Sequence, residues 1–121
     1  MKTDYGLIDK SEEDVKSKSQ EMLDNRELSD IRFILKSCEG RRFLWKVMAA
    51  AGVFRTSFRG GSSDQTAFNE GKRSIGLDIL NSLIEANPKS FTQMQEEYQS
   101  DLERRKRKEK EIIEKKTSGL I

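Results

Sequence analysis

The sequence predicts an all-α protein: a small bundle of three or four helices, with an N-terminal helical arm and a long basic C-terminal helix projecting from it. Three observations lead to this fold class. Apolar residues recur every three to four positions over most of the chain, which is helical spacing. The alternation typical of strands is absent, and the chain has a single Pro. With 121 residues, 36% of them charged and 34% hydrophobic, the chain can build at most one small core.

Residues 1–28 are predicted to form an acidic arm. Ser11 is a good helix N-cap, and the acidic run Glu12–Asp14 follows it in the first turn, where the helix dipole favours negative charge. Apolar residues are few in this segment. Because a helix with so little apolar surface is weakly anchored, we expect an arm that docks loosely or is ordered by a partner.

Residues 29–100 are predicted to form the helical domain. Its first helix has Ser29 as its cap and stops near Gly40, a residue type suited to the left-handed end of a helix. A second helix with a wide apolar stripe runs to Ala51, and Gly52 closes it. The first part of the domain should therefore hold two short helices.

A loop, a third helix and the start of a fourth complete this domain. The loop contains Gly60–Gly61 and has no helical period. Asp64 or Thr66 can cap the third helix, which runs to about Ala86. The pair Asn87–Pro88 then ends one helix and starts the next, because Pro fits the first helical position.

The C-terminal extension, residues 101–121, is predicted to be a basic helix that projects from the domain. Eight bases and five acids lie between residues 101 and 116, the reverse of the acidic N-terminus. Several of these bases have an acid four residues away, with which they can form ion pairs, and this indicates a solvated helix. The alternative is nucleic-acid contact, because five consecutive bases are more than such ion pairs within the helix require. The nucleic-acid-binding candidates are Arg104, Arg105, Lys106, Arg107 and Lys108.

The composition excludes most catalytic chemistry. The chain has no His, so the usual general base and the commonest metal ligand are both missing. Cys38 is the single cysteine, so no disulfide can form within the chain, and we assign it no role. No phosphate-binding glycine loop and no paired carboxylates are recognisable. We expect no enzyme activity, no cofactor, no metal and, without a long apolar run, no membrane span.

Two glycines inside the third helix, Gly71 and Gly76, require an explanation. Each costs about 0.5–1 kcal/mol relative to Ala, which indicates that another backbone approaches closely. Helix packing within the domain is one explanation, and a partner chain or phosphate near residues 69–73 is the other. Bases near these glycines and near Trp45 are candidates to contact a partner. The partner-binding candidates are Arg41, Arg42, Lys46, Arg55, Arg59, Lys72 and Arg73.

Many of these residues belong to one longer pattern. It comprises Gly40-Arg41-Arg42-Phe43 with Trp45, then Gly52-Val53-Phe54-Arg55 with Phe58, then Asn69-Glu70-Gly71 with Arg73 and Gly76. Over about residues 29–96 the chain resembles a family of small proteins from short-tailed bacteriophages, or podophages, that are encoded among virion-structural genes. The resemblance implies a structural unit in which Glu70 pairs with an arginine, Arg42 for one, while Phe54 and Phe58 pin the loop. The residues given a structural role are Trp45, Phe54, Phe58, Glu70, Gly71 and Gly76.

The same resemblance implies a function. We expect a non-enzymatic protein of the phage particle, either a structural or portal-tail component or an ejected internal protein, that docks on larger phage proteins through helical arms. Its partners would be portal, tail or internal proteins, or a second copy of the chain. The alternative is a nucleic-acid-binding accessory that acts in genome packaging or in the infected cell. The expected location is the virion, and the host cytoplasm during assembly.

Overall fold

The protein folds into four helices. A computed structural model describes the backbone of residues 2–56 and 59–119, and the side chains from residue 11 onward. Over these residues the elements are α1 (Lys2–Leu35), α2 (Cys38–Ala50), α3 (Ser63–Ala86) and α4 (Ser90–Gly119), with no strand. The predicted all-α fold class is confirmed.

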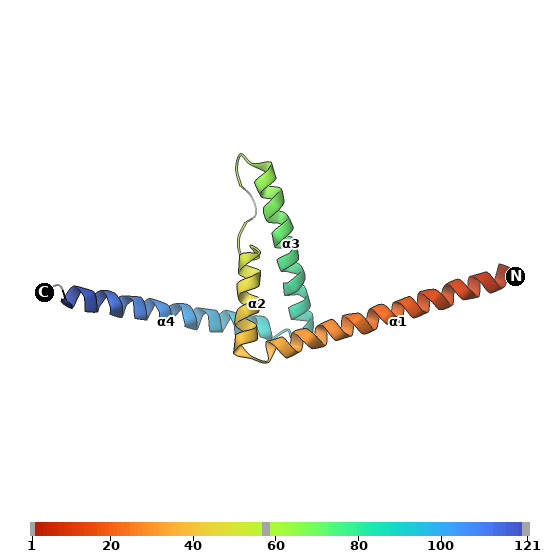
Figure 1. The fold of residues 1–121 in the computed structure, drawn as a ribbon, viewed down its shortest axis with the longest axis horizontal. Helices are drawn as coiled ribbons and strands as arrows, with labels where there is room; N and C mark the ends of the chain where they lie inside the picture. Colours follow the sequence, from red (N-terminus) through yellow and green to blue (C-terminus); the bar gives the residue numbers. More distant parts are fainter. Residues whose placement is uncertain (1, 57–58, 120–121) are drawn as a thin grey trace.

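The four helices are arranged as an inverted T (Figure 1). Helices α2 and α3 form an upright antiparallel hairpin with the connecting loop at its tip. At the base of the hairpin, α1 arrives from one side and α4 leaves on the other, so the two ends of the chain lie at opposite extremes of the molecule (Figure 1). The bundle is therefore small, because only the inner ends of the two long helices take part in it.

Helix α1 is one continuous element, and the predicted break at Ser29 is wrong. Between residues 11 and 35 the chain has neither Gly nor Pro, so nothing stops the helix from running on. Ser29 is exposed and lies inside α1, six residues before its end. The arm and the first core helix are thus a single rod, of which Ile31 and Leu35 pack on the core.

Helix α2 starts after a tight turn in which Ser37 is the N-cap. The Ser37 hydroxyl accepts a hydrogen bond from the Gly40 amide at 2.9 Å. Gly40 therefore lies in the first turn of α2 and does not end the preceding helix as predicted. A Cβ at this position would collide with the Ile34 carbonyl group, so Gly permits the close approach of α1 and α2. At the other end, Gly52 follows the cap with φ of 84°, as predicted for a helix-closing glycine.

Helix α3 is capped at both ends by residues that bind the backbone. Its N-cap is Ser62, whose hydroxyl accepts from the Gln65 amide at 3.2 Å, and not the predicted Asp64 or Thr66. At the C-terminal end the cap is Asn87, whose backbone amide donates to the Leu83 carbonyl at 2.9 Å and whose side chain accepts from the Lys89 amide, in the turn before α4, at 3.1 Å. The predicted break at Asn87–Pro88 is confirmed, but Pro88 lies in the turn and α4 starts at Ser90, not at Pro88 as predicted.

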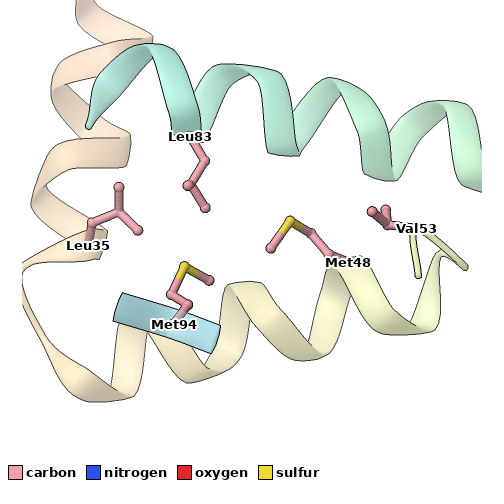
Figure 2. Packing of buried hydrophobic residues seen from close by; sticks show 5 residues of the cluster. All are labelled: Leu35, Met48, Val53, Leu83 and Met94. Carbon is pink, nitrogen blue, oxygen red and sulfur yellow. The ribbon is translucent and has the colours of Figure 1, made fainter. Parts of the chain in front are cut away.

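The core is small and draws on all four helices. Met48 and Leu83 have no exposed surface, and three further apolar side chains surround them between α2 and α3 (Figure 2). The buried cluster comprises Leu35, Met48, Val53, Leu83 and Met94. This agrees with the single small core expected from the composition.

The two glycines of α3 have different environments. A Cβ at Gly76 would lie 2.5 Å from Val53 Cγ2 and 2.7 Å from Ala51 Cβ. The prediction of close packing is therefore confirmed at Gly76, where the end of α2 lies against α3. At Gly71 an added Cβ would meet nothing within 4 Å, so the same prediction is wrong there.

Candidate partner-binding groove

Arg41 joins the start of α2 to α4 and to the end of α1. Its Nε donates to both carboxylate oxygens of Glu97, at 2.9 and 3.2 Å, and its Nη2 lies 2.8 Å from Glu97 Oε1. Its Nη1 donates to the Leu35 carbonyl at 2.8 Å, which satisfies a terminal carbonyl of α1. The hydrogen bond to Glu97 raises the pKa of Arg41 above its ordinary value, against the opposing effect of burial.

Arg41 was predicted to contact a partner, but its donors are directed inward and its side chain is only 12% exposed. It positions the neighbouring residues of α2 beside α4. A second arginine has a comparable role at the base, since Arg32 Nε donates to the Ala86 carbonyl at the end of α3, at 2.9 Å. Each arginine binds the last turn of a helix, where the dipole favours a cation.

Four aromatic rings pack together where α2, the following turn and α4 meet. The ring centroid of Trp45 lies 4.6 Å from that of Phe54, 5.2 Å from that of Tyr98 and 5.9 Å from that of Phe91. These separations are typical of stacked aromatic pairs. Trp45 and Phe54, to which the sequence analysis gave a structural role, both take part in these contacts, whereas Phe58 lies outside the described residues.

A groove of about 610 Å³ opens between α2 and α4, next to this aromatic cluster. Trp45 and Tyr98 supply aromatic surface, five bases surround them, and Asp101 is the one acid. Asp101 is partly neutralised, since its Oδ1 lies 3.4 Å from Arg104 Nη1. The groove is lined by Arg42, Trp45, Lys46, Ala49, Tyr98, Asp101, Arg104, Arg105 and Lys108. We call it the α2/α4 groove.

The α2/α4 groove brings together residues from two separate sequence predictions. Arg42 and Lys46 come from the predicted partner-binding set, and three members of the basic cluster come from the predicted nucleic-acid-binding set. On α4 the spacing of three, then four, places Arg104 and Lys108 on the same side of the helix as Asp101. The exposed Lys106 and Arg107 are not among the groove-lining residues.

The chemistry of this groove suits a negatively charged ligand with apolar parts. Guanidinium groups bind carboxylates and phosphates through paired N–H donors, and Lys ammonium groups add point charges. Aromatic faces offer a surface on which apolar side chains or bases can stack. The described residues contain no group of three His, Cys, Asp or Glu that could hold a metal ion.

The remaining predicted partner-binding residues lie toward the tip of the hairpin, away from the α2/α4 groove. Arg55, Arg59 and Lys72 line a hollow of about 180 Å³ between the loop and the start of α3. The Lys72 ammonium group lies 5.1 Å from the centre of the Phe68 ring, a cation–π distance. Arg73 lines a second hollow of about 540 Å³ beside Arg55.

Glu70 does not pair with Arg42. Glu70 lines the second hollow of the tip with Arg73, whereas Arg42 lines the α2/α4 groove. Within the described part of the chain, no ion pair joins the two residues. The predicted pairing is wrong because Arg42, in the first turns of α2, borders α4, whereas Glu70 lies toward the start of α3 near the tip of the hairpin.

Glu97 and Asp101 were not identified from the sequence. The sequence showed Tyr98 on the apolar face of the fourth helix, and Glu97 and Asp101 border that face at a spacing of four. That spacing marks a helix surface but does not indicate which helix faces it. Glu97 lies 56 positions from Arg41, and only the packing of α4 across the base brings them together.

Comparison with protein families identifies the chain. The profile of the Bbp19-like phage protein family matches residues 31–96, which is more than half of the sequence. The comparisons with curated proteins and with solved structures found no match. Along the residues that the structure describes, none of the helices combines the length and apolarity needed to cross a membrane. The chain belongs to the Bbp19-like phage protein family.

Proposed function

We propose that this member of the Bbp19-like phage protein family is a non-enzymatic component of the phage particle that docks on a larger phage protein. The proposed docking surface is the α2/α4 groove. Portal, tail and internal proteins of a podophage particle are the partners we consider. Family membership supports the phage context, and the absence of His from the sequence disfavours general acid–base catalysis.

The observation that carries this proposal is the composition of the α2/α4 groove. Five bases and two aromatic side chains converge there from two helices, with one acid among them. An acidic segment with apolar side chains, such as a helix edge or a chain terminus, would pair its carboxylates with the bases and lay its apolar groups on Trp45 and Tyr98. Arg41 supports this surface by holding α2 against α4.

The test uses two double variants of α4 that remove the same charge. In R105A/K108A both substituted residues line the groove, and in the control K106A/R107A neither does. Phage lacking the gene would be complemented with each variant, and purified particles would be analysed by mass spectrometry. We expect the groove variant to be at least about tenfold depleted from particles, while the control stays near the wild-type level. Equal incorporation of both variants, or absence of the wild-type chain from particles, contradicts the proposal.

A second candidate function is supported by the cluster of five consecutive bases on α4. All of Arg104–Lys108 are exposed, so a nucleic-acid backbone could follow this helix. In that case the two double variants would weaken DNA binding equally, because phosphate contacts depend on charge more than on groove shape. Retention on DNA measured over a salt series separates the two functions: a steep slope favours the nucleic-acid role, and no retention at moderate salt favours docking.

A further inference from the structure

The two arms of the molecule are exposed along their lengths and carry opposite charge. Every side chain from residue 11 to 27 on α1, and from 103 to 119 on α4, is exposed. Residues 11–30 hold seven acids and three bases, and residues 101–116 hold eight bases and five acids. Each arm is therefore attracted to the other and repelled by a copy of itself.

The arms cannot satisfy this attraction within one chain. Helices α1 and α4 extend from the base of the hairpin in opposite directions (Figure 1). At about 1.5 Å per residue, the outer part of each arm lies tens of ångströms from the outer part of the other, well beyond a Debye length of about 8 Å at physiological salt. The charges that match can meet only between molecules.

The shape of the molecule allows a two-fold arrangement with a second copy in which both arms of each copy are paired. A two-fold axis at the base, perpendicular to the line of the arms, turns each arm into the direction of the other. The acidic α1 of one copy then runs antiparallel to the basic α4 of the second, and the reverse pairing forms at the same time. Because α1 has 34 residues and α4 has 30, the paired arms are of similar length.

We propose that the protein forms a closed two-fold dimer in which α1 of each copy pairs antiparallel with α4 of the other. Exposed apolar side chains on the outer parts of both arms support this pairing. Val15 and Met22 are seven residues apart on one side of α1 and are 67% and 72% exposed. Ile112 and Ile113 on α4 are also exposed. Pairing would remove these groups from water, while pairing like arms would oppose acids to acids or bases to bases.

The experiment reverses the charge of each arm with substitutions that leave the α2/α4 groove intact. The α1 variant is E12K/E13K/E21K and the α4 variant is K106E/K110E/K115E; none of these residues lines the groove. Lys and Glu have similar helix propensity, so the helices should persist, which circular dichroism would verify. Mass in solution would be measured by light scattering and sedimentation over a concentration series.

The wild-type chain should reach twice the 14.0 kDa of one copy, with weaker association at high salt. Each variant alone should dimerise at least about 100-fold less tightly, because both pairings change from attraction to repulsion. An equimolar mixture of the two variants should dimerise again, and so should a chain that carries all six substitutions. A wild-type chain that stays monomeric, grows into longer assemblies, or keeps its dimer in either single-arm variant overturns the proposal.

This dimer is independent of the docking function proposed above. If the charge-reversal experiment contradicts the dimer, the docking proposal still stands or falls on particle incorporation. That experiment compares groove residues with non-groove residues on α4 and does not measure the mass of the protein in solution. Conversely, a groove variant that enters particles normally leaves the mass measurements unchanged. If the mixture of the two arm variants stays monomeric, that result contradicts the dimer but not the docking function.

Discussion

The base of the hairpin and the two arms differ in almost every property that determines stability. In the hairpin and at its base, a cluster of five apolar side chains is buried and two arginines bind the carbonyls of helix ends. Along the arms, the same helices continue with every side chain in solvent. The comparison teaches that the folding energy is concentrated in the core of the hairpin and its base, while the outer arms supply surface for association. Substitutions at the base should change stability, and substitutions on the arms should change association.

The largest effect should come from the core. Met48→Ala removes a side chain that has no exposed surface, so we expect a loss of about 2–5 kcal/mol in the free energy of unfolding. For so small a core this is enough to unfold much of the protein at 25 °C. Urea denaturation followed by circular dichroism measures it. The control, Met22→Ala on the arm, should change the stability of the dilute, monomeric chain by less than about 0.5 kcal/mol; equal losses would show that the arm contributes to folding as much as the core does.

The ion pair at the base gives the next effect. Arg41→Ala leaves Glu97 without its partner and the Leu35 carbonyl without a donor, so we expect a loss of about 2–3 kcal/mol. The same change at the exposed Arg42 should cost less than about 0.5 kcal/mol.

The pH dependence of this pair has a definite sign. A raised pKa in the folded state means that the contribution of Arg41 to stability is complete below the pKa of an unfolded Arg and is lost only as the pH rises through the still higher pKa of the folded state. The difference in the free energy of unfolding between wild type and Arg41→Ala should therefore stay constant between about pH 6 and 9, because Arg is fully charged throughout this range. A steep fall over that range would contradict the assignment.

The two glycines of α3 sharpen the comparison within one helix. Gly76→Ala pushes a methyl group against Val53 and Ala51, so we expect a loss of about 1–3 kcal/mol. Gly71→Ala places the same group in open space and should stabilise the helix by about 0.5–1 kcal/mol. Thermal melting of both variants tests this, and changes of the same sign would show that the contacts of Gly76 do not matter.

The smallest effect concerns the start of α2. Ser37→Ala removes the side chain that accepts from the Gly40 amide, and should cost about 1 kcal/mol. Ser29→Ala, at the position predicted from sequence as a cap, should be neutral or slightly stabilising because Ser29 lies inside α1. A chemical denaturation curve for each variant measures the difference, and the opposite order would restore the predicted helix boundary.

The sequence alone determined the features that depend on near neighbours. Signals that act over a few residues predicted the all-α fold and two of the three breaks between helices. These signals are the helical spacing of apolar residues, the pair Asn87–Pro88 and the helix-closing Gly52. The opposite charge of the two ends was also evident. The predictions were wrong where one residue type fits two positions in a helix. Ser29 could cap a helix or lie inside one, and Gly40 could end a helix or lie in its first turn, close to the preceding helix.

Only the tertiary structure decided which distant residues meet. Arg41 and Glu97 are 56 positions apart, and their pairing depends on the crossing of α2 and α4 at the base. The same crossing joined two predicted basic sets into the α2/α4 groove and separated Glu70 from Arg42. It also gave Gly76 a close neighbour and left Gly71 without one. The reason is physical: propensity, capping and periodicity act within a turn or two of helix, whereas contacts between helices depend on how whole rods pack and in which direction each leaves the core.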